Sequence, residues 1–489
     1  MKLSRIGIAF FIFACLTTCT APKTPPPNIL FILADDWSYP FASALGESYI
    51  RTPNLEKLAQ QGVVFENAYC SSPSCTPSRA SILTGRYPHI LGEGVNLCGK
   101  LDVKTPTYVQ LMRKNGYSVA FDRKGWAPGD FTKMGYTENP CGESSEFGAF
   151  VDKLKPEQPF FFWFGTHDPH RPFVRGSGQR MGMDVKKIKV PAFLPDTPEI
   201  RGDLADYFSE IERFDREIGN LLEKLKNTNR LENTIIVVAS DNGMPFPHAK
   251  ANLYDYGTRV PLIISSFSDA LVKKVRNSSF VNLIDLTPTF LDIAGIKNQP
   301  KMDGMSLMPV LKGEKTTPRS EVFLERERHC LCRAEMDYGA GYPMRAIRTK
   351  EYLYIQNFRP NRIPAGDETI ANTPSVYGDV DGGPTKVYMM DNRKLPTVKP
   401  LFDMGFGKRP SEELYVIKND PYNIHNVANL PEFADTKKQL KNRLLQWMKT
   451  QKDPRLNGGG DEIDRYQATT RAWITKTDII LLDEPQLKP

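Results

Sequence analysis

The sequence predicts a layered α/β protein with one large domain and a smaller second domain. Its 489 residues are more than one hydrophobic core usually holds. As far as Gly313, apolar runs of strand length alternate with amphipathic stretches of helical spacing, the pattern of a sheet covered by helices. Beyond Gly313 the apolar runs are shorter and typical of an antiparallel sheet.

Nearly continuous apolar runs predict the strands of the large domain. They cover residues 28–34, 117–121, 159–165 and 234–240. Runs without polar alternation suit parallel strands that are buried on both faces. Most of them are followed directly by acidic, amide or imidazole side chains. Open α/β sheets bind ligands beyond the carboxyl ends of their strands, so we expect these side chains to meet there.

Two amphipathic segments predict helices that pack on this sheet. In the first, Thr52 is the expected N-cap, Pro53 suits the first helical position and Gly62 ends the helix. In the second, residues 203–226, apolar side chains recur at helical spacing over the whole segment.

The smaller domain is predicted to be α+β, with an antiparallel sheet. Strands are expected within 342–357 and 413–416, a Gly/Pro/Asp-rich loop at 363–384, and a closing helix at 439–449. The predicted domain ranges are 28–315 for the large domain and 316–475 for the smaller one.

The first residues indicate an export signal. Two basic residues precede an apolar run over 6–16, which is too short to span a membrane. The Leu-Thr-Thr-Cys stretch ending at Cys19 resembles a bacterial lipoprotein cleavage site. We therefore predict a signal peptide at 1–19, a lipid anchor on Cys19 and a Pro-rich tether at 20–27. The alternative is ordinary cleavage and free release. Either route predicts an exported protein in the periplasm or at the cell surface.

Charge and cysteine usage narrow the function classes. The formal net charge of +7 favours an anionic ligand. Because no nucleic-acid-binding motif is present, we expect a small anion or an anionic polysaccharide rather than nucleic acid. The cysteines beyond Cys19 form no CxxC pair, so neither a zinc site nor a redox motif is indicated. Export permits disulfides, whose pairing stays open.

The segment 75–86, Cys-Thr-Pro-Ser-Arg-Ala-Ser-Ile-Leu-Thr-Gly-Arg, resembles the signature of the sulfatase family. The resemblance implies an alkaline-phosphatase-like large domain with a mostly parallel sheet between helices. It also implies that a maturation enzyme oxidises Cys75 to formylglycine, whose hydrate attacks sulfur. The chemistry explains the motif, because a thiolate would form a dead-end adduct. A hydrate can instead expel sulfate by collapsing to the aldehyde. A helix start favours anions, and Arg79 can hold the hydrate.

Four further residues are candidate metal ligands. Asp35 and Asp36 follow one predicted strand, and Asp241 and Asn242 follow another. Carboxylate and amide oxygens suit Ca²⁺ or Mg²⁺ rather than zinc. The resemblance implies a divalent metal at these positions, most often Ca²⁺, which also contacts the oxygen of the modified Cys75.

Basic residues are expected to hold the sulfate. Lys124, His167 and Lys250 fall where sulfatases keep sulfate-contacting side chains, with His167 protonating the leaving atom. One position departs from the family, because Trp126 stands where many sulfatases have a histidine that helps the hydrate collapse. The Trp126 ring could stack on a sugar face or belong to the core.

Four more residues are candidate saccharide contacts, each with a structural alternative. His170 lies just past a strand and could be a cap, and His248 could be an ordinary loop residue. His329 and Arg333 lie near a charged stretch that could be an exposed strand.

Several segments resemble the heparan N-sulfatase, or sulfamidase, group of sulfatases more specifically. They are residues 167–172, 190–198, 240–247, 286–290 and 342–348. We therefore expect a hydrolase of sulfuric esters or sulfamates that acts on a sulfated oligo- or polysaccharide. Whether it cleaves an S–N or an S–O bond stays open. The alternatives are a phosphodiesterase or phosphonate hydrolase of the same superfamily, and a catalytically inactive saccharide-binding protein.

Overall fold

The computed structural model describes residues 26–314, 319–335, 339–368 and 376–470. The predicted signal peptide with Cys19, most of the tether, the boundary at 315/316 and the end of the smaller domain at 475 lie outside these residues. The division into two domains at that boundary therefore stays a prediction.

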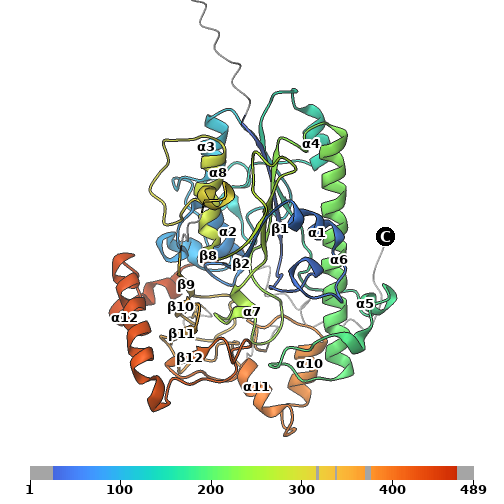
Figure 1. Ribbon diagram of the computed structural model, residues 1–489. Coiled ribbons are helices and arrows are strands. Elements are labelled where there is room, and N and C mark those ends of the chain that lie inside the picture. Colours follow the sequence, from blue (N-terminus) through green and yellow to red (C-terminus); the bar gives the residue numbers. More distant parts are fainter. Residues whose placement is uncertain (1–25, 315–318, 336–338, 369–375, 471–489) are drawn as a thin grey trace, which may run out of the picture.

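An eight-stranded sheet forms the centre of the larger part (Figure 1). Its strand order is β4-β3-β5-β1-β6-β7-β2-β8, and every strand is parallel to its neighbours except β7, which is antiparallel to both β6 and β2. The strands are β1 Asn28–Ala34, β2 Gly62–Tyr69, β3 Ser118–Arg123, β4 Glu143–Ser144, β5 Phe160–Gly165, β6 Thr234–Ser240, β7 Leu262–Ser265 and β8 Val275–Asn282. The predicted α/β class with a mostly parallel sheet is confirmed.

The three central strands, β1, β5 and β6, are buried along their whole lengths. Successive side chains of a strand point to opposite faces. Leu30 and Ile32 accordingly enter one core with α1, α4 and α6, whereas Ile29 and Phe31 enter a second core with α2, α3 and α8. The sheet is thus a layer between two sets of helices (Figure 1).

The helices of the larger part follow the predicted alternation. α1 begins at Pro53, but the Thr52 side chain accepts no capping bond from the helix and instead accepts one from the Ser43 amide. α6 begins five residues before the predicted start at 203, at Pro198. The helices are α1 Pro53–Gln60, α2 Cys75–Thr84, α3 Tyr108–Lys114, α4 Phe147–Lys153, α5 Ser177–Arg180, α6 Pro198–Asn227, α7 Asp255–Thr258, α8 Leu286–Ile293 and α9 Met308–Leu311.

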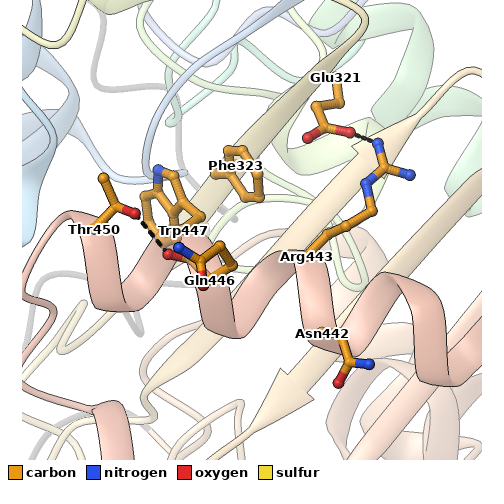
Figure 2. Close-up of a pocket in the computed structure, with 7 residues that line it drawn as sticks. All are labelled: Glu321, Phe323, Asn442, Arg443, Gln446, Trp447 and Thr450. Carbon is orange, nitrogen blue, oxygen red and sulfur yellow. Dashed lines mark hydrogen bonds and ion pairs between the residues drawn. The ribbon is translucent and has the colours of Figure 1, made fainter.

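A second sheet of four antiparallel strands, in the order β12-β11-β10-β9, lies below the first in Figure 1. One of its faces packs on Tyr69 and Phe280 of the larger part. The other face is covered by α12, whose Trp447 ring stacks on Phe323 with 4.8 Å between ring centroids (Figure 2). The elements are β9 Glu321–Arg326, β10 Met344–Thr349, β11 Tyr352–Asn357, α10 Pro384–Asp391, α11 Lys399–Phe406, β12 Glu412–Val416 and α12 Ala434–Thr450.

The six cysteines of the described residues are all free. No helix in those residues combines the length and the apolar character that crossing a membrane requires.

Candidate active site

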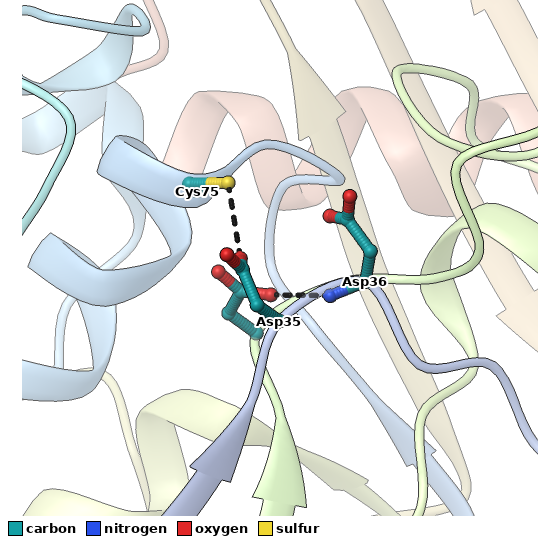
Figure 3. Close-up of side chains that lie close together, drawn as sticks. Asp35, Asp36 and Cys75 are labelled. Atoms are coloured by element: carbon teal, nitrogen blue, oxygen red, sulfur yellow. Dashed lines mark hydrogen bonds between the residues drawn. The ribbon is translucent and has the colours of Figure 1, made fainter. Parts of the chain in front are cut away.

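The carboxyl ends of β1 and β6 bring the predicted acidic and amide residues together. Ala34 pairs with Ser240 in the parallel register, so the two residues that follow each strand emerge side by side. The Asp36 amide donates to Asp241 Oδ1 over 3.2 Å, and Asn242 Nδ2 donates to Asp36 Oδ1 over 2.7 Å. Figure 3 shows Asp35 and Asp36 at this edge, next to the Cys75 side chain.

This cluster fits a hard divalent cation. Ligand atoms of Asp35, Asp36, Cys75 and Asp241 lie within 4.8 Å of one another. The Asn242 Oδ1 atom is buried and has no hydrogen-bond partner among the residues that the structure describes, which is costly unless a cation binds it. Burial raises the pKa of Asp36 to about 7 and that of Asp241 to about 6, and a bound cation would stabilise their ionised forms.

Cys75 is the first residue of α2 and faces the cluster (Figure 3). Its Sγ lies 3.5 Å from Asp35 Oδ1 and 3.4 Å from Lys124 Nζ. Burial raises the pKa of the Cys75 thiol well above its usual value, and the nearby Lys124 only partly opposes this. The unmodified side chain is therefore a protonated thiol, which is a poor nucleophile.

Arg79 lies one turn further along α2 and is completely buried. Its Nε donates to Asp241 Oδ2 over 2.8 Å, and its Nη1 donates to the carbonyls of Lys124 and Gly125. Its Nη2 lies 3.5 Å from Asp35 Oδ1. These contacts fix the Asp35 and Asp241 carboxylates and the start of the Lys124 loop. The predicted contact of Arg79 with the hydrate or the sulfate stays a prediction.

Two lysines contact different carboxylates of the cluster. Lys124 follows β3, and its Nζ donates to Asp35 Oδ2. Lys250 lies on the loop after β6, and its Nζ donates to Asp36 Oδ2 over 2.7 Å. Burial opposes the charge of Lys250, but the surrounding acidic groups, Asp36 first among them, together outweigh it and raise the pKa well above its usual value. Both lysines are therefore cations beside Cys75, where an anion would bind.

Both histidines that follow β5 lie near this cluster. Burial lowers the pKa of His167, although its side chain is accessible to solvent, and Asp35 and Lys124 are among the groups that influence it. His170 Nε2 lies 3.7 Å from Asp36 Oδ2, and burial lowers its pKa as well. His170 thus contacts a metal-site carboxylate directly.

His329 reaches the start of α2 from the second sheet's side of the molecule. Its Nδ1 shares a hydrogen bond with the Ser74 hydroxyl over 2.8 Å, next to Cys75. Burial lowers the pKa of His329 to about 4, so the ring is neutral near pH 7. Its predicted role as a saccharide contact stays a prediction.

Three candidate saccharide contacts have structural roles instead. Trp126 is only 1% exposed and lies in the core, so it does not present a face to a sugar. His248 is buried, stacks on Tyr254 and contacts the carbonyls of Tyr422 and Asn423. The Arg333 guanidinium, also 1% exposed, is paired with a buried aspartate, Asp379. Trp126 was predicted from its position in the family pattern, and His248 and Arg333 from polar residue types near the predicted site. Neither signal tells in which direction a side chain points.

Asp381 is a member of the site that the sequence did not indicate. Its Oδ2 accepts a hydrogen bond from Lys250 Nζ over 3.0 Å. It lies in the predicted Gly/Pro/Asp-rich loop, where several aspartates are equivalent by composition. An Asp-Gly-Gly-Pro turn directly before a helix was the one local signal there.

Comparison with known proteins agrees with this geometry. Residues 27–296 match the sulfatase family, and residues 247–362 match the C-terminal domain of N-sulphoglucosamine sulphohydrolase. Human N-sulphoglucosamine sulphohydrolase is 30% identical over 88% of this chain and 92% of its own length. An ulvan-active sulfatase of Formosa agariphila is 28% identical over 87% of this chain and 81% of its own.

A solved structure shares the fold. It is that of a protein in complex with its substrate D-glucosamine-2-N,6-O-disulfate, with a TM-score of 0.61, 20% identity, and coverage of 88% of this chain and 99% of that one. The family match covers more than half of the sequence and includes Cys75, Arg79 and the four metal-site residues. The chain therefore belongs to the sulfatase family, whose members hydrolyse sulfuric esters or sulfamates.

Proposed function

We propose that this enzyme removes the N-sulfate group of glucosamine residues in a sulfated saccharide. The observation that carries the proposal is the match of residues 247–362 to the C-terminal domain of N-sulphoglucosamine sulphohydrolase. That stretch supplies Lys250 and His329, two of the side chains around Cys75. The 30% identity to the human enzyme over most of both chains supports the same assignment.

Sulfate hydrolysis would require two further groups, a divalent cation and a formylglycine at position 75. Asp35, Asp36, Asp241 and Asn242 would hold a divalent cation, which offsets charge on the sulfate and on the attacking oxygen. Formylglycine at position 75 would supply that oxygen as its hydrate. The all-oxygen ligand set favours Ca²⁺ or Mg²⁺, and we propose Ca²⁺, the ion most often found in the family.

The side chains around residue 75 would bind the sulfate and protonate the leaving group. Lys124 and Lys250 hold the sulfate oxygens next to residue 75, while Arg79 keeps the Asp241 carboxylate in place. His167, accessible and close to the cluster, donates a proton to the departing nitrogen. Sulfate binding favours this step, because an anion nearby stabilises the protonated imidazole.

The test is sulfate release by enzyme coexpressed with a formylglycine-generating maturation enzyme. Glucosamine N-sulfate and glucosamine 6-O-sulfate are compared at equal concentration, with Cys75→Ala as the inactive control. We expect free sulfate and glucosamine from the N-sulfated sugar. Sulfate from the O-sulfated sugar alone would refute the N-sulfatase assignment.

A second candidate is the hydrolysis of O-sulfate esters in an algal polysaccharide. Ulvan-active sulfatases of Formosa agariphila match at 27–28% identity over 73–87% of this chain. Ulvan oligosaccharides therefore belong in the same screen, and their desulfation without action on the N-sulfated sugar would favour this second function.

We also propose that the enzyme is exported and anchored by a lipid on Cys19. The basic, apolar and cysteine-ended pattern of residues 1–19 supports this proposal. Fractionation of bacterial cells that express the full chain is the test. We expect the wild type with the membranes and Cys19→Ser in the soluble fraction; equal distribution of both would refute the anchor.

A further inference from the structure

The side chain of Asp381 occupies the outer end of a line of contacts that starts at the metal site. Asp36 is 0% exposed, Lys250 is 5% exposed and Asp381 is 23% exposed. Lys250 Nζ joins the two carboxylates, at 2.7 Å from Asp36 and 3.0 Å from Asp381. Asp381 is therefore the most exposed of these three side chains.

One oxygen of this carboxylate is available to a ligand. Lys250 is the one hydrogen-bond donor to Asp381 in the described part of the chain, and it binds Oδ2. Burial opposes ionisation, but Lys250, followed by His170 and His329, holds the pKa of Asp381 well below its usual range. Asp381 is thus an acceptor only, and no described residue donates to its Oδ1.

The loop that carries Asp381 is held in a fixed conformation. Lys386 Nζ donates to the carbonyls of Tyr377 and Val380, which closes the loop on itself. Two residues before Asp381, the Asp379 carboxylate turns the other way and pairs with the buried guanidinium of Arg326. The two aspartates of this turn therefore have separate roles, one inside the protein and one at the site.

The same loop is also tied to the larger part of the molecule. Arg171 forms a two-pronged ion pair with Asp203 on α6, and the Thr385 hydroxyl donates to the same carboxylate over 2.6 Å. A Cβ at Gly383 would lie 2.3 Å from Arg171 Nη1, so the loop lies directly against that guanidinium. Asp381 is consequently preorganised before the substrate binds. Less conformational entropy is therefore lost when it forms a hydrogen bond with the substrate.

The chemistry of a carboxylate decides which part of the substrate it can meet. A sulfate group carries no hydrogen-bond donor near pH 7 and would be repelled by Asp381. The sugar that bears the sulfate carries hydroxyl and N–H donors, which a carboxylate accepts strongly. A second anionic group at the same place, such as another sulfate or a uronate, would again be repelled.

We propose that Asp381 is a specificity-determining residue, which accepts a hydrogen bond from a hydroxyl or N–H group of the sugar that carries the sulfate. It disfavours substrates with a second anion at that position. This role rests on the proposed saccharide sulfatase function, in which Lys250 contacts the sulfate group and Asp381 contacts the sugar that carries it.

The competing explanation is that Asp381 only positions Lys250. The variant Asp381→Asn distinguishes this explanation from recognition of the sugar. The Asn amide oxygen still accepts from Lys250 but lacks the charge. The matured enzyme is assayed with glucosamine N-sulfate and glucosamine 6-O-sulfate for kcat/KM, and with inorganic sulfate as inhibitor for Ki. The Ki of inorganic sulfate reports on binding by Lys250 and not by Asp381, because sulfate has no hydrogen-bond donor for Asp381.

For a role in sugar recognition, we expect kcat/KM on the hydrolysed sugar to fall about 10- to 100-fold in Asp381→Asn. The Ki of inorganic sulfate should be unchanged or lower, because a repelling charge is removed. The ratio of kcat/KM for D-glucosamine-2-N,6-O-disulfate to that for the monosulfated sugar should rise. Asp391→Asn, an exposed change at the end of α10, the helix that follows the Asp381 loop, is the matched control and should leave both constants unchanged.

Two results would overturn the inference while leaving the proposed function intact. One is a rise in the Ki of sulfate that equals the fall in kcat/KM, which would make Asp381 a positioning residue for Lys250. The other is an unchanged kcat/KM. If the wild-type enzyme released sulfate from no sugar at all, the proposed function itself would fail.

Discussion

Arg79 and Asp241 form an ion pair from which water is excluded: Nε donates to Oδ2 over 2.8 Å, and neither side chain is exposed. Breaking such a pair leaves an uncompensated buried charge. Arg79→Ala is expected to lower the free energy of unfolding by about 3–5 kcal/mol, measured by urea denaturation. Arg113→Ala, which removes a pair with Glu138 that is 36% and 42% exposed, should cost less than about 1 kcal/mol. Equal losses in both variants would contradict the buried pairing.

Asn242 provides a test of the metal site that does not depend on activity. Its buried, unpaired Oδ1 is a predicted ligand, so Asn242→Ala should weaken Ca²⁺ binding by at least about 10-fold. Because a cation that binds only the folded state raises its stability, the Ca²⁺-induced rise in Tm should shrink in parallel. Asn442→Ala, on the exposed side of α12, is the control. An unchanged calorimetric Kd in Asn242→Ala would remove this residue from the ligand set.

Cys75 should be the only cysteine whose replacement ends catalysis. Cys75→Ala is expected to abolish sulfate release and to retain Ca²⁺ binding, because the three carboxylates and Asn242 remain. Cys70→Ala, a change at a buried cysteine that faces the Gly257 carbonyl, should retain turnover. Mass spectrometry of the wild-type peptide that contains residue 75 should show loss of sulfur. Retention of the thiol in fully active enzyme would contradict the formylglycine nucleophile.

Trp126 should affect stability rather than substrate binding. Its ring is in the core, so Trp126→Ala should lower the free energy of unfolding by about 3–5 kcal/mol. Trp126→Phe retains most of the packing and should leave KM for the sugar unchanged. A large rise in KM in Trp126→Phe, with an unchanged Tm, would instead indicate stacking on the substrate.

His89 should make stability depend on pH. Its Nδ1 lies 2.7 Å from Glu325 Oε2, with Asp453 and Arg345 as the other charged groups nearby and Trp447 against the ring. Burial opposes protonation, but Glu325 and Asp453 outweigh it together and raise the pKa of His89 in the folded state. The protonated ring thus stabilises the fold below its unfolded pKa of about 6.5, and this contribution is lost as pH rises through the folded pKa.

The comparison of wild type with His89→Gln isolates this contribution. Urea unfolding at about pH 6 and about pH 8 should show a larger gap between the two proteins at the lower pH. A gap that is the same at both values, or larger at the higher pH, would contradict the assignment.

The fold followed closely from the sequence wherever burial alone determines structure. The strands 28–34 and 234–240 coincide with β1 and β6, because a strand buried on both faces leaves an unbroken apolar run. The predicted stretch 342–357 is two strands, β10 and β11, joined at a tight turn, and the predicted helix 439–449 begins earlier, at Ala434. Those differences arise at element ends, where packing rather than local pattern decides.

The sequence predicted the part of the site that is formed by residues at the carboxyl ends of strands. Asp35, Asp36, Asp241 and Asn242 meet because parallel neighbours end at the same edge. Asp381 and the Ser74–His329 contact depend instead on how a distant loop and the second sheet pack against that edge. The burial of Trp126 and Arg333 depends on the same packing. These contacts arise from tertiary packing between distant segments, so the spacing of the residues along the sequence does not predict them.

The attachment of the Asp381 loop to α6 has a consequence for how this scaffold could change its substrate. The groups that would hold the sulfate lie next to the sheet edge, whereas Asp381 lies on a short segment of the smaller part that is held by Arg171, Asp203 and Thr385. Residues 376–391 could therefore be exchanged between sulfatases as a cassette, provided that these three anchors, the Asp379–Arg326 pair and the buried side chains of the segment, Tyr377, Val380 and Met389, are kept. Selectivity for the sugar would then be transplanted while the machinery for breaking the bond to sulfur stays as it is.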